Sequence, residues 1–145
     1  MCLAMKSALY SREILRLASS VPHHGRLAQP QGSAERSSPV CGSRIIVDVK
    51  LDADGALVSL GQEVKACALG QASAALMGAH ALGRKPAELA EARNALAAYL
   101  QGESDNPGDW PGLSVFDQAR AYPARHGAIL LPFDAVVDAA DRAGR

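Results

Sequence analysis

The sequence predicts an α+β domain in which a three-stranded antiparallel sheet is packed on one face by helices. Strand-like alternation of apolar and polar residues fills one run, between residues 44 and 66, and helical spacing of apolar residues fills the run that follows. Strands and helices that are separated in this way along a chain favour an α+β arrangement over a parallel α/β sheet. At 145 residues the chain has the length of one domain, which we assign to residues 1–145.

The charge balance argues against one class of partner. Lys and Arg together number 15, as do Asp and Glu, so the formal net charge is +0 at pH 7. A balanced surface disfavours nucleic acid or an anionic membrane as the main partner. No apolar run approaches the ~20 residues of a membrane span, and Met1–Met5 is too short for the apolar region of a signal peptide. We therefore expect a cytoplasmic protein.

The first predicted element is a short amphipathic helix within Leu9–Ser20. Ile14 and Leu17 recur at near-helical spacing, and Ser11 is suited to cap the helix at its N-terminus. Residues Val21–Pro39 follow; they are rich in Pro, Gly, Ser, Gln and His and have no period. This composition predicts a loop that leads to the first strand.

The sheet is predicted next. One face of the first strand is apolar and the other polar, because successive side chains in a strand point to opposite faces. The apolar positions are Ile45, Val47, Val49 and Leu51, and the polar ones Arg44, Asp48 and Lys50. Asp54-Gly55 predicts a two-residue hairpin turn, since such turns need positive φ angles. Residues 57–60 and 62–66 are then predicted to return as two strands of a meander.

Four helical segments are predicted after the sheet. They are residues 67–81, 86–100, 113–121 and 128–143. Pro86 suits the first turn of the second, since a proline there removes only an N–H that has no partner in the helix. Ala128–Ala143 has an apolar face that contains Leu131 and Val136.

The candidate functional residues are two cysteines at the ends of the predicted sheet. Cys41 precedes the first strand, and Cys67 opens an Ala-rich helix, where the helix dipole favours a thiolate. Cys2 is set aside, because it lies in a terminus that we expect to be frayed. An odd number of cysteines without an export signal indicates thiols rather than a disulfide framework. The alternative is that Cys41 and Cys67 are small buried apolar residues, as free cysteines often are.

Two segments carry a family resemblance. Residues 38–47 read Ser-Pro-Val-Cys-Gly-Ser-Arg-Ile-Ile-Val, and residues 65–77 read Lys-Ala-Cys-Ala-Leu-Gly-Gln-Ala-Ser-Ala-Ala-Leu-Met. They resemble the NifU-like N-terminal domain of the U-type iron-sulfur cluster assembly scaffolds, which reads Asn-Pro-x-Cys-Gly-Asp-x-Ile and Gly-Cys-Ala-Ile-Ser-x-Ala-Ser-x-Ser-x-Met. The resemblance extends over nearly the whole chain and implies the U-type scaffold fold.

The resemblance also implies a ligand set, from which this sequence departs. Cys41 and Cys67 would bind iron or an iron-sulfur cluster, with zinc as a further candidate. The family's aspartate is replaced by Ser43, a poor metal ligand. Its third cysteine falls at Ala128 and the histidine before it at Gly127, one position from His126, a candidate third metal ligand. Both replaced positions are expected at the rim of the site.

Two functions stay open at this point. The chain is either a scaffold that binds iron, a cluster or zinc, or a family member without a cluster that acts as a protein-interaction module. The resemblance implies a cysteine desulfurase and apo-protein acceptors as partners, and a homodimer would supply four thiolates from two chains. No catalytic residues are predicted, because the sequence offers no acid-base constellation or phosphate loop.

Overall fold

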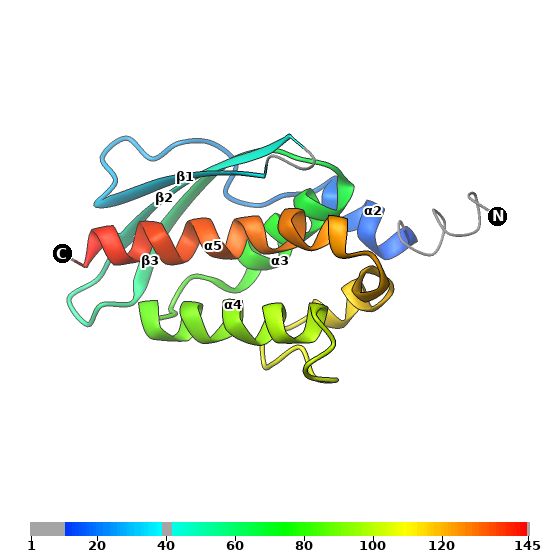
Figure 1. Ribbon diagram of the computed structural model, residues 1–145. Helices are drawn as coiled ribbons and strands as arrows, with labels where there is room; N and C mark the ends of the chain where they lie inside the picture. Colours follow the sequence, from blue (N-terminus) through cyan, green and yellow to red (C-terminus); the bar gives the residue numbers. More distant parts are fainter. Residues whose placement is uncertain (1–10, 39–41, 145) are drawn as a thin grey trace.

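The computed structural model describes residues 11–38 and 42–144, and its first layer is an antiparallel sheet (Figure 1). The three strands lie in the order β1-β2-β3 and are Gly32–Ser38, Ser43–Leu51 and Leu57–Lys65. Ala34 faces Val47 in the first pair of strands, and Val49 faces Leu60 in the second. Helices cover one face of this sheet. The predicted fold class is confirmed.

Strand β1 lies where a loop was predicted, so the prediction for Val21–Pro39 is wrong in its second half. The strand was missed because its inward positions are small rather than apolar. A Cβ added to Gly32 would lie 2.1 Å from the carbonyl oxygen of Ala139, so only glycine fits beside that helix. Glu35 on the other face is exposed, and Arg36, on the helix side of the strand, is exposed as well and donates to the carboxylate of Asp138 in α5 at 2.8 Å. Such a polar edge strand lacks the alternation of Val, Ile and aromatic residues that identifies a strand in sequence.

The two predicted return strands form one strand, β3, which passes through Gly61 without a break. Gly61 marks a close approach of the backbone: a Cβ there would lie 2.6 Å from the carbonyl oxygen of Gly25. The predicted two-residue turn is also wrong. Strands β2 and β3 are joined by Asp52–Ala56, where the Asp52 carboxylate accepts hydrogen bonds from the backbone N–H groups of Asp54 at 2.9 Å and Ala56 at 3.0 Å. Gly55 adopts φ +87°, as the predicted positive φ requires.

The helices confirm the predicted elements. Ser11 accepts a hydrogen bond from the N–H of Ile14 at 3.3 Å, as expected of an N-cap. Their bounds are α2 Arg12–Ala18, α3 Ala68–His80, α4 Pro86–Leu100 and α5 His126–Ala143, with two 3₁₀ segments, η1 Leu113–Ala121 and η2 Pro123–Arg125, before α5. In the described part of the chain, no helix is long and apolar enough to cross a membrane.

Helix α5 is the centre of the helical layer. It packs on β1 and β2 on one side and on α3 and α4 on the other (Figure 1). Arg93 of α4 donates to the carboxylate of Asp134 at 2.7 Å. Pro132 interrupts the hydrogen bonding within α5, and the buried hydroxyl of Ser73 donates to the nearby carbonyl of Ile129. These contacts bury the apolar strand face (Ile45, Val47 and Val49) against the helices.

Asp48 does not face solvent as the alternation predicted, because residues 22–28 cover the outer face of the sheet there. Its side chain is fully buried and accepts two hydrogen bonds from Arg26, at 2.6 and 3.1 Å, one from Ser33 at 2.6 Å and one from the N–H of Leu27 at 3.0 Å. Burial alone raises the pKa of a carboxyl group, but these donors outweigh it, so the pKa of Asp48 lies below its ordinary value. Asp48 is therefore an anion in the folded protein, and its carboxylate holds the loop of residues 22–28 on the sheet.

We expect Asp48→Asn to lower the free energy of unfolding at pH 7 by about 1.5–3 kcal/mol, the range for hydrogen bonds to a charged group. Because folding lowers the pKa of Asp48, its stabilisation is present above the unfolded-state pKa of about 3.9 and is lost as the pH falls through the folded-state value. The difference between the two proteins should therefore shrink below about pH 4. Urea unfolding at several pH values, with the exposed Glu63→Gln as control, measures it; a difference that does not change with pH would contradict the role of the charge.

Candidate functional site

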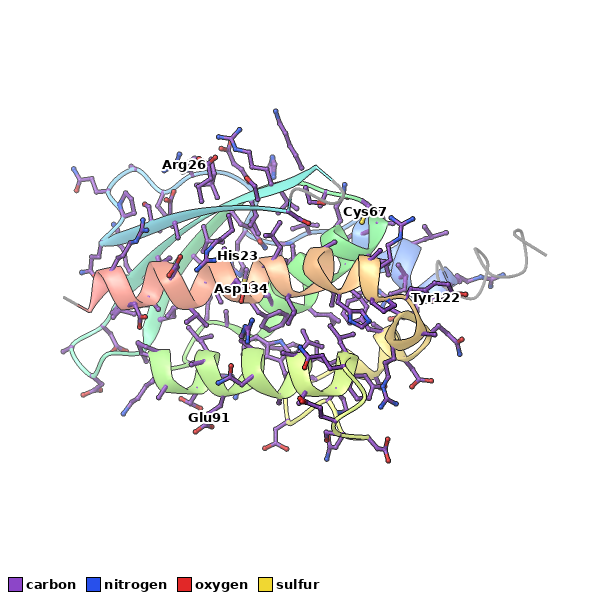
Figure 2. The ribbon with its side chains drawn as sticks, viewed as in Figure 1. His23, Arg26, Cys67, Glu91, Tyr122 and Asp134 are labelled. Carbon is purple, nitrogen blue, oxygen red and sulfur yellow. The ribbon has the colours of Figure 1, made fainter. Side chains whose placement is uncertain are left out.

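Cys67 lies between the last strand of the sheet, β3, and helix α3. It follows β3 and is the N-cap of α3, with φ −65° and ψ 171°, and its carbonyl accepts the N–H of Gln71 at 2.9 Å. The side chain is partly buried and packs against the core. In the described chain its sulfur caps no backbone N–H of the helix. The predicted position at a helix start is confirmed (Figure 2).

Three elements meet at this end of the sheet. Ser38 at the end of β1 pairs with Ser43 at the start of β2, and the next residue, Arg44, pairs with Lys65 just before Cys67. Helix α5 also begins here, because a Cβ added to Gly127 would lie 3.4 Å from the hydroxyl oxygen of Ser38. The end of β1, the start of β2, the end of β3 and the start of α5 are therefore neighbours.

Cys41 lies outside the described residues, so its predicted role stays a prediction. The residues on either side of the undescribed segment 39–41 are both placed at this end of the sheet. The N–H of Gly42 donates to the carbonyl of Ser38 at 2.9 Å, and Gly42 has φ +69°. Glycine adopts a positive φ without strain, which accounts for the glycine at position 42.

Ser43 and Ala128 are not at the rim of the site, as was expected; both are buried, with 2% and 1% of their surface exposed. Ala128 is buried because α3 and α5 approach closely at Gly70, where an added Cβ would lie 3.8 Å from the Cβ of Ala128. Ser43 is buried as the first residue of the central strand. Gly127, one position before Ala128, is exposed.

His126 is the first residue of α5, and one of its ring nitrogens is already engaged. Its Nε2 lies 2.9 Å from the carbonyl oxygen of Ala119 in η1. A carbonyl only accepts, so Nε2 carries the proton and donates. Any metal ligation by His126 would therefore use Nδ1, and the bond to Ala119 gives the histidine a structural role.

Among residues 11–38 and 42–144, no group of three or more His, Cys, Asp and Glu side chains could hold a metal ion. Within these ranges the site thus offers the single thiol of Cys67, the hydroxyls of Ser38 and Ser43, and the imidazole of His126. Ser38 was not predicted as part of the site. Its place followed only from the pairing of β1, a strand that the sequence did not reveal.

The fold and the place of Cys67 define the class of a U-type scaffold, and comparison with known proteins agrees. The chain is similar to the crystal structure of a nitrogen-fixing NifU-like protein (N-terminal) from Brucella abortus, with 36% identity, a TM-score of 0.90 and coverage of 97% of each chain. It is also similar to the iron-sulfur cluster assembly scaffold protein IscU of Thermotoga maritima, with 26% identity over 94% of this chain and 96% of that protein.

A third protein shows the same fold. It is a putative iron-sulfur cluster assembly scaffold protein for the SUF system from Fervidobacterium islandicum, with 22% identity, a TM-score of 0.85 and coverage of 92% of this chain and 98% of that one. No family model matches the sequence. On the similarity to the Brucella protein, the chain belongs to the NifU-like family of iron-sulfur cluster assembly scaffolds.

We expect His126→Ala to lower the free energy of unfolding of the metal-free protein by about 1 kcal/mol, the usual net value of one hydrogen bond. The exposed His24→Ala serves as control, since it removes a histidine without such a bond in the described chain. Urea unfolding of both variants measures the effect. If His126 instead acted only as a metal ligand, the metal-free protein would keep its stability and only its zinc affinity would fall.

Proposed function

We propose that this chain is a scaffold that holds iron, an iron-sulfur cluster or zinc as its cargo through Cys41 and Cys67. The observation that carries the proposal is the position of Cys67 at the N-terminus of α3, two residues after the end of β3, which lies beside the start of β2. Thiolates are soft ligands that suit iron-sulfur clusters and zinc. Family membership supports the same assignment.

The remaining positions of the site favour weak retention of the cargo. Ser43 and Ala128 are neutral, so neither supplies the negative charge that an aspartate or a cysteine would bring next to a metal ion. His126 is the candidate third ligand through Nδ1. Each missing ligand lowers both the affinity and the geometric definition of a metal site. A scaffold with such a site would pass its cargo on readily.

The partners follow from the same proposal. A cysteine desulfurase would supply sulfur, and apo-proteins would receive the cluster; the scaffold itself performs no catalysis. A homodimer that joins two such sites would offer four thiolates, the number that iron-sulfur clusters commonly use. The balanced charge supports neither nucleic acid nor a membrane as partner, and a cytoplasmic location accords with it.

One observation favours the alternative, a family member that binds no cluster and acts as a protein-interaction module in iron-sulfur assembly. In the described ranges, no three side chains of ligand type gather at Cys67. The two functions differ in one measurable property, the dependence of bound metal on the two cysteines.

We expect purified protein to contain less than one zinc or iron per chain, and Cys67→Ser to remove it, because one thiolate cannot hold the ion alone. Elemental analysis measures the metal content. Cys2→Ser is the matched control, since it removes a cysteine that the proposed site does not use. Unchanged metal in the double variant Cys41→Ser, Cys67→Ser would exclude the site and favour the interaction module.

We also expect the double variant Ser43→Asp, Ala128→Cys to form more cluster than the parent on anaerobic reconstitution with iron and sulfide, as followed by visible absorption. It would add one thiolate and one carboxylate beside Cys67. Because Ser43 is buried, the new carboxylate will lower stability by more than the ~0.5 kcal/mol typical of a surface change. Equal reconstitution in parent and variant would contradict the expectation.

The exposed Gly127 provides a control for the assignment of Ala128 to the family's third cysteine position. Gly127→Cys should improve reconstitution less than Ala128→Cys if Ala128 is the family's third cysteine position. The reverse result would move that position by one residue, next to His126.

A further inference from the structure

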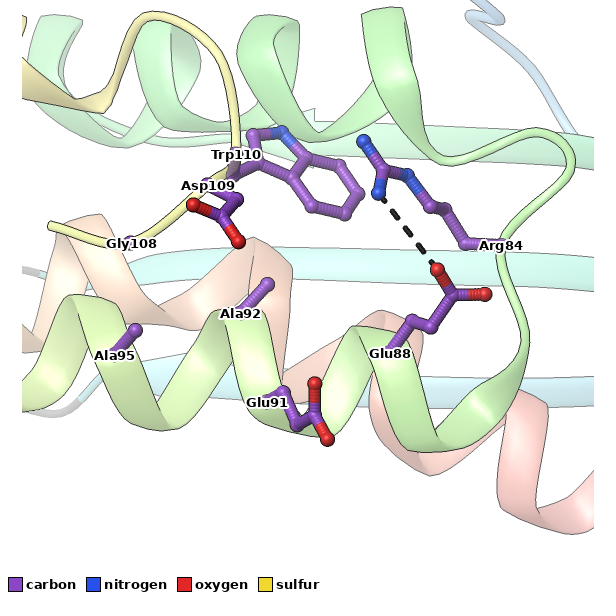
Figure 3. A pocket seen from close by; sticks show the side chains of 8 residues that line it. All are labelled: Arg84, Glu88, Glu91, Ala92, Ala95, Gly108, Asp109 and Trp110. Carbon is purple, nitrogen blue, oxygen red and sulfur yellow. Dashed lines mark ion pairs between the residues drawn. The ribbon is translucent and has the colours of Figure 1, made fainter.

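A second surface feature lies away from Cys67, between α4 and the loop that carries Trp110. This groove, called here the Trp110 groove, is lined by Arg84, Glu88, Glu91, Ala92, Asp109 and Trp110 (Figure 3). Its volume is about 250 Å³. Pockets for small-molecule ligands usually measure about 300–1,000 Å³, so this one suits a single side chain.

The indole of Trp110 forms a rigid wall of the groove. Only 4% of the residue is exposed, and its Nε1–H donates to the carbonyl of Leu76 at 2.9 Å. The ring also packs edge-to-face against Phe133, with the centroids 5.3 Å apart. Since both contacts tie the indole to the core, the wall keeps its orientation whether or not the groove is filled.

The groove already holds one guanidinium. The Arg84 side chain lies over the Trp110 ring, with its central carbon 4.9 Å from the centroid, and its Nε donates to the carbonyl of His80 at 3.2 Å. Its NH1 lies 3.8 Å from the Glu88 carboxylate. Figure 3 shows this ion pair at one end of the groove. Arg84 and Glu88 thus balance each other in charge.

Two further carboxylates, those of Glu91 and Asp109, line the groove. In the part of the chain that the structure describes, neither Glu91 nor Asp109 forms an ion pair or a side-chain hydrogen bond, and both are exposed. They come from opposite sides of the groove, Glu91 from α4 and Asp109 from the loop beside Trp110. The groove therefore has an excess of two negative charges. Among the described residues no three His, Cys, Asp or Glu side chains gather closely enough here to hold a metal ion, which favours an organic cation.

The groove is also well separated from Cys67. Trp110 contacts the C-terminal half of α3 through Leu76 and His80, whereas Cys67 is the residue that precedes its N-terminal end. The helix has 13 residues, which at about 1.5 Å per residue gives a length of about 20 Å. A protein that is held at the groove can leave the Cys67 end open.

We propose that the Trp110 groove docks an arginine side chain of a partner protein, whose guanidinium bridges Glu91 and Asp109. Charge complementarity selects a cation, and the volume selects one side chain. Arginine fits better than lysine because its planar guanidinium presents five N–H donors in a fixed fork, so that it can hydrogen-bond two carboxylates at once. This inference goes beyond the proposed function and does not depend on bound metal.

The chain contains a single tryptophan, so its indole reports on the groove alone. A capped Gly-Arg-Gly peptide is titrated into ¹⁵N-labelled full-length protein while the indole N–H signal of Trp110 is followed by NMR. We expect a saturable shift with a millimolar dissociation constant that weakens as salt is added. The matching Gly-Lys-Gly peptide should bind at least threefold more weakly, and Gly-Glu-Gly should cause no saturable shift.

A pair of double variants tests the assignment to the two carboxylates. Glu91→Gln with Asp109→Asn should weaken binding of the arginine peptide at least fivefold. Asp54→Asn with Glu63→Gln removes the same charge from exposed positions outside the groove and should leave binding within a factor of two of the parent. The metal content of both variants should equal that of the parent, which separates this test from that of the metal site.

Three results would overturn the inference. One is the absence of a saturable shift with the arginine peptide in the parent protein. The second is equal weakening of peptide binding in the two double variants, which would show that binding depends on the net charge of the protein and not on Glu91 and Asp109. The third is a shift of the Trp110 signal by 1 mM Ca²⁺ or Mg²⁺ without any by the peptide, which would make the groove a metal site.

Discussion

The close approach of α5 to both the sheet and α3 is the constraint on which the site depends. Gly32 permits the approach to the sheet, because an added Cβ there would lie 2.1 Å from the Ala139 carbonyl oxygen. On the other side, Gly70 of α3 lies against Ala128, whose carbonyl oxygen would be 3.4 Å from an added Cβ. A side chain at Gly32 would force the helix away from β1. Because α5 lies so near, its first residues reach the end of β1, and Gly127 comes beside Ser38. The site is thus formed by helix packing as much as by its own residues.

Close packing also limits what the site can contain. Ala128 is buried between α5 and α3, and Ser43 is buried in the central strand. The exposed Gly127 differs from both, since a Cβ added there would meet only the Ser38 hydroxyl, at 3.4 Å. In the proposed scaffold, Ala128 therefore provides no thiolate and Ser43 no carboxylate. The cargo would be held chiefly by the two cysteines.

Sequence predicted the elements with strong local signals. Pro86 and the N-cap Ser11 located helix starts, and the Ala-rich run after Cys67 located α3. The sequence did not reveal β1, whose inward residues are small because α5 lies against them. It also predicted that Asp48 faces solvent, because a strand pattern cannot reveal a loop that covers the outer face of the sheet. For the site, the position of Cys67 was predicted, whereas the burial of Ser43 and Ala128 depends on tertiary contacts that have no local signal.

Helix α3 connects the two surfaces to which we assign binding. Residues along it from Leu69 to Gly78 are largely buried, so it is clamped between α2, α5 and the sheet and cannot tilt freely. Cys67 at one end and the Trp110 wall at the other are therefore held at a fixed separation. A scaffold has to be held by a partner while its cargo site stays open to the proteins that fill and empty it. Two surfaces at opposite ends of one buried helix meet that requirement without any change in conformation.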